Sequence, residues 1–594
     1  MTTHWPTGWS WSRMKPCTIP MMPDAFGSAA AGTQLPPAAM SATFLMRAEA
    51  VVARWPRSAL VLLCLCLYLP GFFTVPALDR DEARFAQASR QMVESGDYVN
   101  IRVGSEERNK KPVGIHWAQV AVVHGLEAVG LPARAEIFAY RVPSMLGAIL
   151  AVLATFSFGR ALVGRRAALL GAAMLAGCMV LLVETHIAKT DAALLATVAA
   201  AMGLFGLAYL RPGAFTPRQA AAFWCVLGIS ILLKGPVGPM VPLLTGITLA
   251  VMDRGAPWLR ALRPAWGVPL MLALAAPWMI AIGIATEGRF FAQALGDDMI
   301  AKVAGGEERH WGPPGYYLVV FFIAAFPSAW LVAPALRQAW AARTLPATRF
   351  LLAWLVPTWL VFEAVATKLP HYTMPTYPAL MLLIGAWAMD PLRPMPGRAL
   401  LWAMRVVLVA VAVGIGVLAV VAPSILDGRI PWVAWMVLPL ALLLTWAVMR
   451  AAAHGFWARA GGLGVVLAVP LYAAVLEGVL PRIEAMWLAP RLQASLARVA
   501  PGLPPERFGI VGHAEPSTLF AIGGGLRLLP GGPAAAEFLA EAPGRVVAVG
   551  NRQEAAFQVE AAARGLALRE LATVSGYNYS RGRPITLLLY RTEP

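Results

Sequence analysis

The sequence predicts an all-α polytopic membrane protein that ends in a small α/β domain. Of its 594 residues, 58% are hydrophobic and only 14% are charged, and the mean hydropathy is +0.63, well outside the composition of soluble globular chains. Apolar runs of about 20 residues, the length that crosses a bilayer as a helix, recur as far as residue 480 and then stop. These observations predict a transmembrane domain over 51–480 and a separate domain over 481–594.

The segment before the first apolar run is predicted to lie outside both domains. Residues 1–50 are a mixture rich in Pro, Ala and Met, without the charged region, apolar region and cleavage site of a signal peptide. We interpret them as a disordered or mis-assigned extension, with Met40 and Met46 as alternative starts.

About thirteen apolar segments are predicted to cross the membrane. They lie near 57–77, 138–158, 165–184, 190–210, 218–233, 236–252, 265–285, 315–336, 349–365, 373–389, 400–423, 432–449 and 461–480.

One further stretch, 113–131, decides the orientation of every later span. It carries His116, Gln119, His124 and Glu127. If it lies on the outer surface, the N-terminus is cytoplasmic and nearly all Arg-bearing loops face the cytoplasm, as the positive-inside rule requires. We therefore predict a first outer loop with surface helices over 79–131.

This topology gathers the polar segments on the outer face. They are loop 79–112, "ETHIAKTDAALL" (184–195), "LLKGPVGP" (232–239), loop 286–314, "KLPHY" (368–372) and everything after residue 481. The first of these loops is basic although it faces outward, so its charges need a function other than orientation.

The C-terminal segment has the pattern of a small mixed domain. Strand-like runs "RFGIVG", "RVVAVG" and "PITLLLY" alternate with Ala-rich stretches at 533–541 and 553–565, which favours an outer α/β domain. The run "IGGGLRLLPGG" has glycines but lacks the GK[ST] of a phosphate-binding loop.

The first outer loop holds two acids and three cations that could act on a substrate. Asp81 and Glu82 follow a membrane exit, and helix 82–94 is amphipathic; a capped interfacial helix would use the same acids. Arg84, Lys110 and Lys111 could bind a substrate phosphate, but lipid headgroups would satisfy the same cations.

The later outer segments add four candidates, each with an ordinary alternative. Asp191 begins a span, where capping would suffice, and Lys234 ends one, where it could snorkel to the interface. Lys368 and Tyr372 stand at a helix mouth, and a lysine at the bilayer centre would cost roughly 2.5–3.5 kcal/mol.

A metal ligand is only weakly indicated. His310 follows Glu307 and Glu308, but no fixed helical spacing joins them, and a lone His beside prolines is more often a structural hydrogen-bonding group.

Taken together, the motifs resemble one superfamily of membrane glycosyltransferases. "DEARFAQASRQMVESGDY", "KKPVGIHW", "THIAKTDAALL", "LLKGPVGPMVP", "H…GPPGYYL" and "KLPHYTMPTYPALMLL" resemble, in this order, the lipid A aminoarabinose transferases and protein O-mannosyltransferases, which have the GT-C fold. "SGYNYSRGRPITLLLYR" resembles the outer C-terminal domain of the bacterial branch. The resemblance covers about 57–480 and this last domain.

The resemblance implies a reaction and a set of roles. The donor is a sugar on a polyprenyl phosphate such as undecaprenyl phosphate, and Asp81 lies at the reacting centre. Lys111 binds the carrier phosphate, and the positions of Asp191, Lys368 and Tyr372 match family motif positions. We predict that Asp81, Glu82 and Asp191 are catalytic. The residues predicted to bind the carrier phosphate are Arg84, Lys110, Lys111, Lys234, Lys368 and Tyr372. His310 matches a position that binds a divalent metal or the acceptor. In aminoarabinose transferases an acid precedes the KP lysine and joins that metal; here the position is Lys110.

The sequence therefore predicts an inverting glycosyltransferase of the bacterial inner membrane. Its expected partners are the lipid-linked donor, a lipid or glycan acceptor such as lipid A, and membrane lipids. The formal net charge of +17 comes from scattered clusters, so no nucleic-acid partner is expected. A transporter would need ionisable residues near mid-span, and a lipid-binding scaffold would contact headgroups without chemistry.

Overall fold

Apolar helices make up most of the described chain, as the hydropathy pattern predicts. The computed structural model describes residues 50–108, 110–294, 296 and 312–593. The chain divides into two compact units, Met1–Trp55 and Pro56–Pro594. In the first unit the described residues include a helical turn at 50–54, and everything below concerns the second unit.

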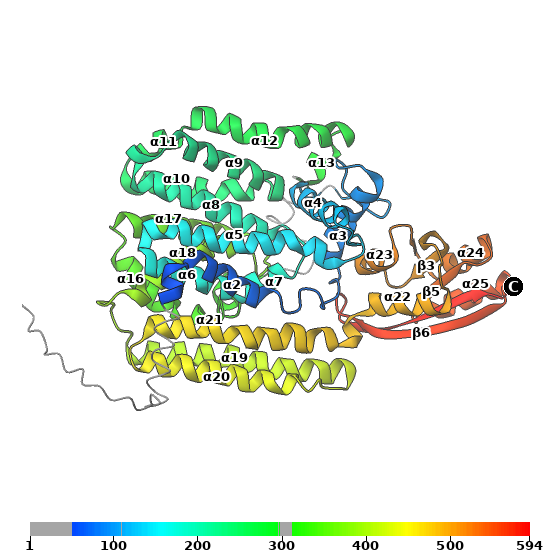
Figure 1. Ribbon diagram of the computed structural model, residues 1–594. Coiled ribbons are helices and arrows are strands. Elements are labelled where there is room, and N and C mark those ends of the chain that lie inside the picture. Colours follow the sequence, from blue (N-terminus) through cyan, green and yellow to red (C-terminus); the bar gives the residue numbers. More distant parts are fainter. Residues whose placement is uncertain (1–49, 109, 295, 297–311, 594) are drawn as a thin grey trace, which may run out of the picture. The chain divides into compact units, whose positions relative to one another are not determined.

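The second unit begins with a bundle of helices (Figure 1). Their bounds are α2 Pro56–Tyr68, α5 Ile137–Val163, α6 Arg165–Gly177, α7 Met179–Thr185, α8 Asp191–Leu210, α9 Pro217–Lys234, α10 Val237–Asp253, α11 Pro257–Leu262, α12 Pro264–Ala285, α15 Tyr316–Ala324, α16 Val332–Ala341, α17 Pro346–Ala364, α18 Tyr377–Met389, α19 Arg398–Asp427, α20 Ala434–Ala453 and α21 Trp457–Ala473.

The predicted spans all contain helix, although fewer helices can cross a bilayer alone. Within the described residues, seven helices are long and apolar enough to span, or eight if the bent pair α6 and α7 is one span. Helices α2, α10 and α18 are apolar but shorter, and the predicted span 315–336 is divided between α15 and α16. The predicted fold class, a polytopic helical protein, is confirmed.

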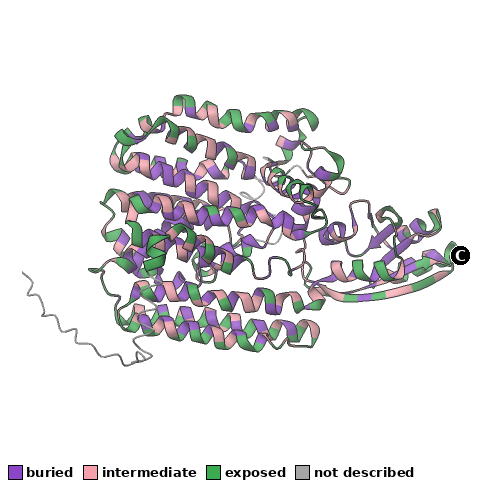
Figure 2. Ribbon diagram, viewed as in Figure 1, coloured by how far each residue is buried: buried purple, intermediate pink, exposed green. Residues whose placement is uncertain are grey.

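Exposed apolar side chains support a membrane setting for the bundle. Outward positions on α12, α19 and α20 are exposed (Figure 2), among them Ile284 and Ile425 at 76% each. Exposed tryptophans lie toward both ends of the α19–α20 pair, Trp402 and Trp446 at one end and Trp432 and Trp435 at the other. Apolar surface between two tryptophan belts is typical of lipid-facing helices.

The break between α6 and α7 sets the direction of the chain toward the outer end. The two helices bend by 59° at Cys178, which has an extended ψ of 126°. Inside a bilayer the freed backbone groups need protein partners. Tyr68 donates to the Ala176 carbonyl at 2.9 Å, Tyr472 donates to the Gly177 carbonyl at 3.2 Å, and the Met179 amide donates to Phe326. The break is therefore built into the fold.

The first outer loop folds against the same end of the bundle. It contains α3 Asp81–Ser95, the hairpin β1 Arg102–Val103 and β2 Glu106–Glu107, and α4 Gly114–Ala128. Helix α4 packs against α3 and α5 and is not among the candidate spans of the described residues, which agrees with its predicted surface position. The short helix α13 Arg289–Phe291 lies nearby (Figure 1).

The C-terminal segment is a five-stranded sheet with helices, as predicted. The strands are β3 Phe508–Val511, β4 Arg527–Leu529, β5 Val546–Gly550, β6 Leu568–Asn578 and β7 Arg583–Thr592, and the helices are α22 Leu488–Val499, α23 Pro516–Ile522, α24 Gly532–Glu541 and α25 Glu554–Ala563.

The sheet order is β4-β3-β5-β7-β6, with β4, β3 and β5 parallel and β7 antiparallel to both neighbours. Strands β4 and β6 were not expected from the sequence because their exposed positions interrupt the apolar pattern. Buried β3 and β5 carry the continuous apolar runs that parallel strands require.

A buried ion pair joins the outer loop to the bundle. Arg141 of α5 donates to both carboxylate oxygens of Glu82, at 2.8 and 2.9 Å, and both side chains are 0% exposed. Arg141 also donates to the carbonyls of Phe72, Val75 and Pro76, where the chain leaves α2. Glu82 accepts in turn from the amides of Leu78 and Ala188, at 2.8 and 3.0 Å.

Removing one member of this pair is expected to destabilise the fold strongly. Arg141→Met leaves the Glu82 carboxylate buried without its counter-charge, and the free energy of unfolding should fall by about 3–5 kcal/mol. Denaturant unfolding in detergent measures the change. Arg134→Met is the control, because Arg134 pairs with Glu127 at the surface, 48% and 24% exposed, and should cost less than about 1 kcal/mol. Equal losses in the two variants would contradict the assignment.

Candidate active site

A large cavity lies where the outer loop, the span ends and the C-terminal domain meet. Its volume is about 1140 Å³. The outer loop forms one wall of the cavity. The loop between α7 and α8 and the segment after α17 form a second wall, and residues of the C-terminal domain form the third. Of the predicted site residues, Asp81, Glu82, Arg84, Lys110, Lys111 and Tyr372 line it.

Asp81 is the first residue of α3 and stands among cations. Arg84 lies 3.9 Å from its carboxylate. Partial burial acts to raise the pKa of Asp81, but the charges of Lys111, Lys189, Arg108 and Arg84 outweigh it and hold the pKa below its ordinary value. The carboxylate is therefore ionised at neutral pH.

The chain enters α3 through a strained residue. Arg80 has a φ of 65°, in the left-handed region that non-glycine residues seldom adopt. Its guanidinium donates to the Ser580 carbonyl of the C-terminal domain at 2.7 Å. This contact helps hold the turn that presents Asp81 to the cavity.

Glu82, also predicted as catalytic, has the contacts of a positioning residue. Both of its oxygens accept from Arg141 and from backbone amides. The amide of Ala188 is one of those donors, so Glu82 fixes the neighbours Asp81 and Lys189 on facing walls of the cavity.

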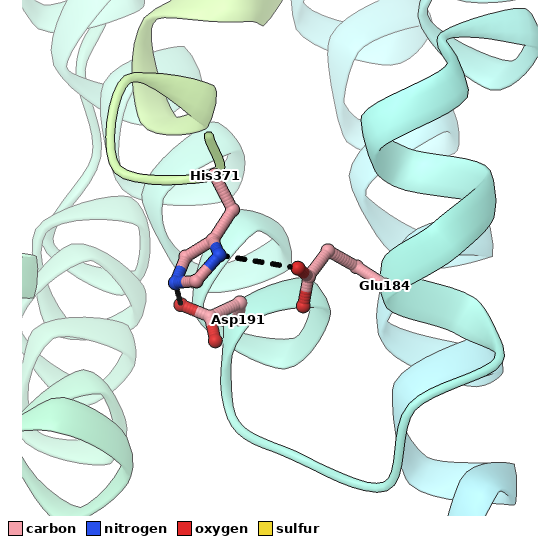
Figure 3. Close-up of side chains that lie close together, drawn as sticks. All are labelled: Glu184, Asp191 and His371. Atoms are coloured by element: carbon pink, nitrogen blue, oxygen red, sulfur yellow. Dashed lines mark ion pairs between the residues drawn. The ribbon is translucent and has the colours of Figure 1, made fainter. Parts of the chain in front are cut away.

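Behind the cavity lies a buried polar cluster that we call the inner cluster, formed by Glu184, Lys189, Asp191, Lys234 and His371. His371 Nδ1 lies 3.3 Å from Glu184 Oε1, and His371 Nε2 lies 3.6 Å from Asp191 Oδ1 (Figure 3). Lys234 donates to Asp191, and its ammonium stands 5.4 Å from the centre of the Tyr372 ring. The predicted residues Asp191, Lys234 and Tyr372 are thus brought together.

Three members of the inner cluster were missed by reasoning from the sequence. Lys189 is 8% exposed yet lines the cavity, and it lies 3.0 Å from Glu184 and 3.5 Å from Asp191. The signal was present in "ETHIAKTD", where Glu184, Lys189 and Asp191 fall within eight residues. His371 was visible in "KLPHY", but nothing in the sequence shows that this segment packs against α7 and α8.

Lys368 does not line the cavity. It is 4% exposed, and its ammonium donates to the carbonyls of Glu363 and Val365, at 2.6 and 2.8 Å. These are carbonyls at the end of α17, which a cation stabilises. In the described structure its contacts are those of a helix cap, and its expected phosphate contact stays a prediction.

The expected metal site at His310 stays a prediction. His310 lies outside the described residues. Lys110 lines the cavity wall, and its ammonium is not a metal ligand. We derive no step through a metal here.

The C-terminal domain closes the cavity through contacts with the outer loop. The hydroxyl of Ser517 in α23 donates to the Asp79 carboxylate, and the Asp79 amide donates to the Tyr579 hydroxyl at 2.5 Å. Arg90 of α3 donates to the Phe520 carbonyl at 2.9 Å. The domain is therefore part of the site.

Comparisons with known proteins agree with this architecture. Residues 131–281 match the family described as dolichyl-phosphate-mannose-protein mannosyltransferase. An undecaprenyl phosphate-alpha-4-amino-4-deoxy-L-arabinose arabinosyl transferase of Aeromonas salmonicida is 30% identical over 57% of this chain and 61% of its own length. The corresponding protein of Pseudomonas paraeruginosa is 28% identical over 66% of this chain and 68% of its own. The match thus spans under two thirds of the first relative.

Solved structures show the same fold. The crystal structure of ArnT from Cupriavidus metallidurans bound to undecaprenyl phosphate has a TM-score of 0.71 at 18% identity, over 89% of this chain and 97% of that one. The apo structure gives 0.66 at 20% identity, over 93% and 98%. The chain therefore has the GT-C glycosyltransferase fold.

Docking of the C-terminal domain should weaken as the pH rises. Burial raises the pKa of Asp79 to about 6, Glu515 adds to the rise, and the Ser517 and Tyr579 hydroxyls and Arg80 oppose it. The folded state therefore favours the protonated form of Asp79. Its contribution to the free energy of unfolding is fully present below about pH 4 and is lost as the pH rises through 6, by up to roughly 3 kcal/mol. Thermal unfolding of the full chain between pH 5 and 7.5 measures it.

Asp79→Asn should flatten this dependence. Asp97→Asn is the control, since the pKa of Asp97 is lowered by its hydrogen bonds with Asn100 and Val99, which outweigh burial. A wild-type chain that gains stability over this range through Asp79 would contradict the prediction.

Proposed function

We propose that the chain is an inverting glycosyltransferase. It moves a sugar from a polyprenyl phosphate to an acceptor at the periplasmic face of the inner membrane, with the N-terminus in the cytoplasm and the C-terminal domain in the periplasm. The observation that carries the proposal is the ionised Asp81 carboxylate beside Arg84, in a cavity that Lys111 and Lys189 also line. The names of the relatives favour undecaprenyl phosphate as the carrier and 4-amino-4-deoxy-L-arabinose as the sugar.

The cations of the cavity serve the leaving group. As the bond from the anomeric carbon to the phosphate oxygen breaks, the electron pair stays on the lipid phosphate. Preorganised cations stabilise charge that develops in a site shielded from water. Lys111 and Arg84 on the outer loop face the same cavity as Lys189, so a phosphate can be held between the two walls.

Asp81 serves the acceptor. An acceptor oxygen forms the new bond to the anomeric carbon on the face opposite the departing phosphate. A hydroxyl acceptor must lose a proton, and an ionised Asp81 can take it. A phosphate acceptor is already nucleophilic and needs orientation only, for which the cations of the same cavity suffice. Lipid A fits either case and is the acceptor we propose.

A transporter is less well supported. A substrate path would place ionisable groups near the middle of the spans. In the described residues the acids and amines of the site lie at helix ends, with Asp191 at the start of α8 and Lys234 at the end of α9. A lipid-binding scaffold would not need an acid held among cations.

The proposal is tested by comparing cells with and without this protein. Mass spectrometry of lipid A and of polyprenyl-linked sugars should show loss of one sugar substituent and accumulation of its donor. Unchanged profiles of both lipids would contradict the proposal.

Asp81→Asn should abolish transfer without unfolding the chain. Loss of the carboxylate removes a group that is typically worth 10²–10⁴-fold in proton transfer, measured as donor consumption in membranes. Asp97→Asn is the matched control, because Asp97 lies in the same loop and caps the amides of Val99 and Asn100 away from the cavity. Normal transfer by the Asp81 variant would count against the assignment.

Lys111→Gln should move the acid limb of the pH–rate profile to higher pH. Lys111 is the first of the cations that hold the pKa of Asp81 down, so its loss raises that pKa. Since the ionised form is the active one, the rate then falls at a higher pH on acidification. Lys110→Gln, its sequence neighbour, is not among those cations and should leave the limb in place. A limb that does not move with Lys111→Gln overturns the role of Asp81.

A further inference from the structure

The inner cluster has the ligand set of a cation site. Glu184, Asp191 and His371 each offer one ligand atom, and the three atoms lie within 4.8 Å of one another. They come from α7, from the start of α8 and from the segment after α17, and they converge in Figure 3. Two carboxylates and an imidazole are a common donor set for divalent metals.

The ammonium of Lys189 already stands at that position. Its Nζ lies 3.0 Å from Glu184 Oε1, 3.5 Å from Asp191 Oδ2 and 3.4 Å from His371 Nδ1. It therefore contacts one potential ligand atom of each residue. Lys234 supplies a second ammonium to Asp191.

Two ammonium groups already stand beside the carboxylates of this cluster. A divalent ion would add two positive charges within a few ångströms of both lysines.

We propose that Lys189 is a protein-borne cation that takes the place of a divalent metal in this site. Glu184, Asp191 and His371 hold its ammonium group in place, and the positive charge of that group faces the cavity. Lys189 lines the cavity. The amide of its neighbour Ala188 donates a hydrogen bond to Glu82 at 3.0 Å, so the ammonium is held facing the wall that carries Asp81. The role of Lys189 toward an anionic donor rests on the proposed function. Its position among Glu184, Asp191 and His371 does not depend on that function.

The proposal predicts that removing the amine creates a metal site. Lys189→Ala empties the position while keeping all three ligands. Glu184 Oε2 is buried and has no hydrogen-bond partner among the described residues, so it is available as a further ligand. The purified full-length variant should bind about one Mn²⁺ per chain, measured by electron paramagnetic resonance and metal analysis, and Mn²⁺ should raise its Tm. The wild-type chain and Lys189→Arg should do neither.

Lys368→Ala is the matched control. Lys368 is as deeply buried as Lys189, at 4% against 8% exposed, but it contacts neutral backbone carbonyls. Its loss should create no Mn²⁺ site. In Lys189→Ala, a second change, Glu184→Gln, should abolish Mn²⁺ binding.

Metal binding tests the role of Lys189, whereas sugar transfer tests the proposed function. Mn²⁺ binding by Lys189→Ala but not by wild type supports the proposal whether or not transfer is detected. One tightly held divalent ion in the wild-type chain that is lost in His371→Ala overturns it. A Lys189→Ala chain that elutes as a folded monodisperse species yet binds no Mn²⁺ also overturns it. Donor consumption by wild type that is unchanged by EDTA supports it, while loss of consumption on EDTA treatment with restoration by a divalent ion overturns it.

Discussion

The site depends on one buried ion pair, Glu82 with Arg141. Arg141 binds the carbonyls at the end of the first span, and Glu82 binds the amides of Leu78 and Ala188. Three segments that are distant in the sequence, 72–82, the start of α5 and the loop before α8, are thereby tied together. A buried pair of this kind adds little net stability over an apolar alternative. Its value here is geometric, because Asp81 and Lys189 are the immediate neighbours of residues it holds.

The second constraint is the broken span at Cys178. A straight helix from α6 through α7 would carry Glu184 along the bundle axis, whereas the 59° bend turns it toward α8 and the segment after α17. The tyrosine hydroxyls that satisfy the freed carbonyls make this bend tolerable at membrane depth. The inner cluster and the cavity then lie side by side, with Lys189 belonging to both. Charged groups are thus concentrated at one end of the bundle.

The structure brings several of the predicted site residues together. Asp81, Arg84, Lys110, Lys111 and Tyr372 line one cavity, and Asp191 meets Lys234 directly behind it. Glu82 also lines the cavity but is held in a buried ion pair with Arg141. Lys368 binds the carbonyls at the end of α17. Both sets of partners are determined by packing. Lys189, Glu184 and His371 were overlooked, since each has an ordinary explanation until its neighbours are known. The catalytic and phosphate-binding roles stay predictions.

Hydropathy alone determined that this is a helical membrane protein with a C-terminal α/β domain. The length of an apolar run indicates whether it can span a bilayer, its period indicates helix or strand, and both are local properties of the sequence. The motifs alone pointed to the superfamily. Only the tertiary structure decided which charges meet. An acid and an amine hundreds of residues apart acquire partners through helix packing, and packing depends on side-chain shape across many elements at once. The pairing of Glu82 with Arg141 and the seating of Lys189 among Glu184, Asp191 and His371 are products of that packing.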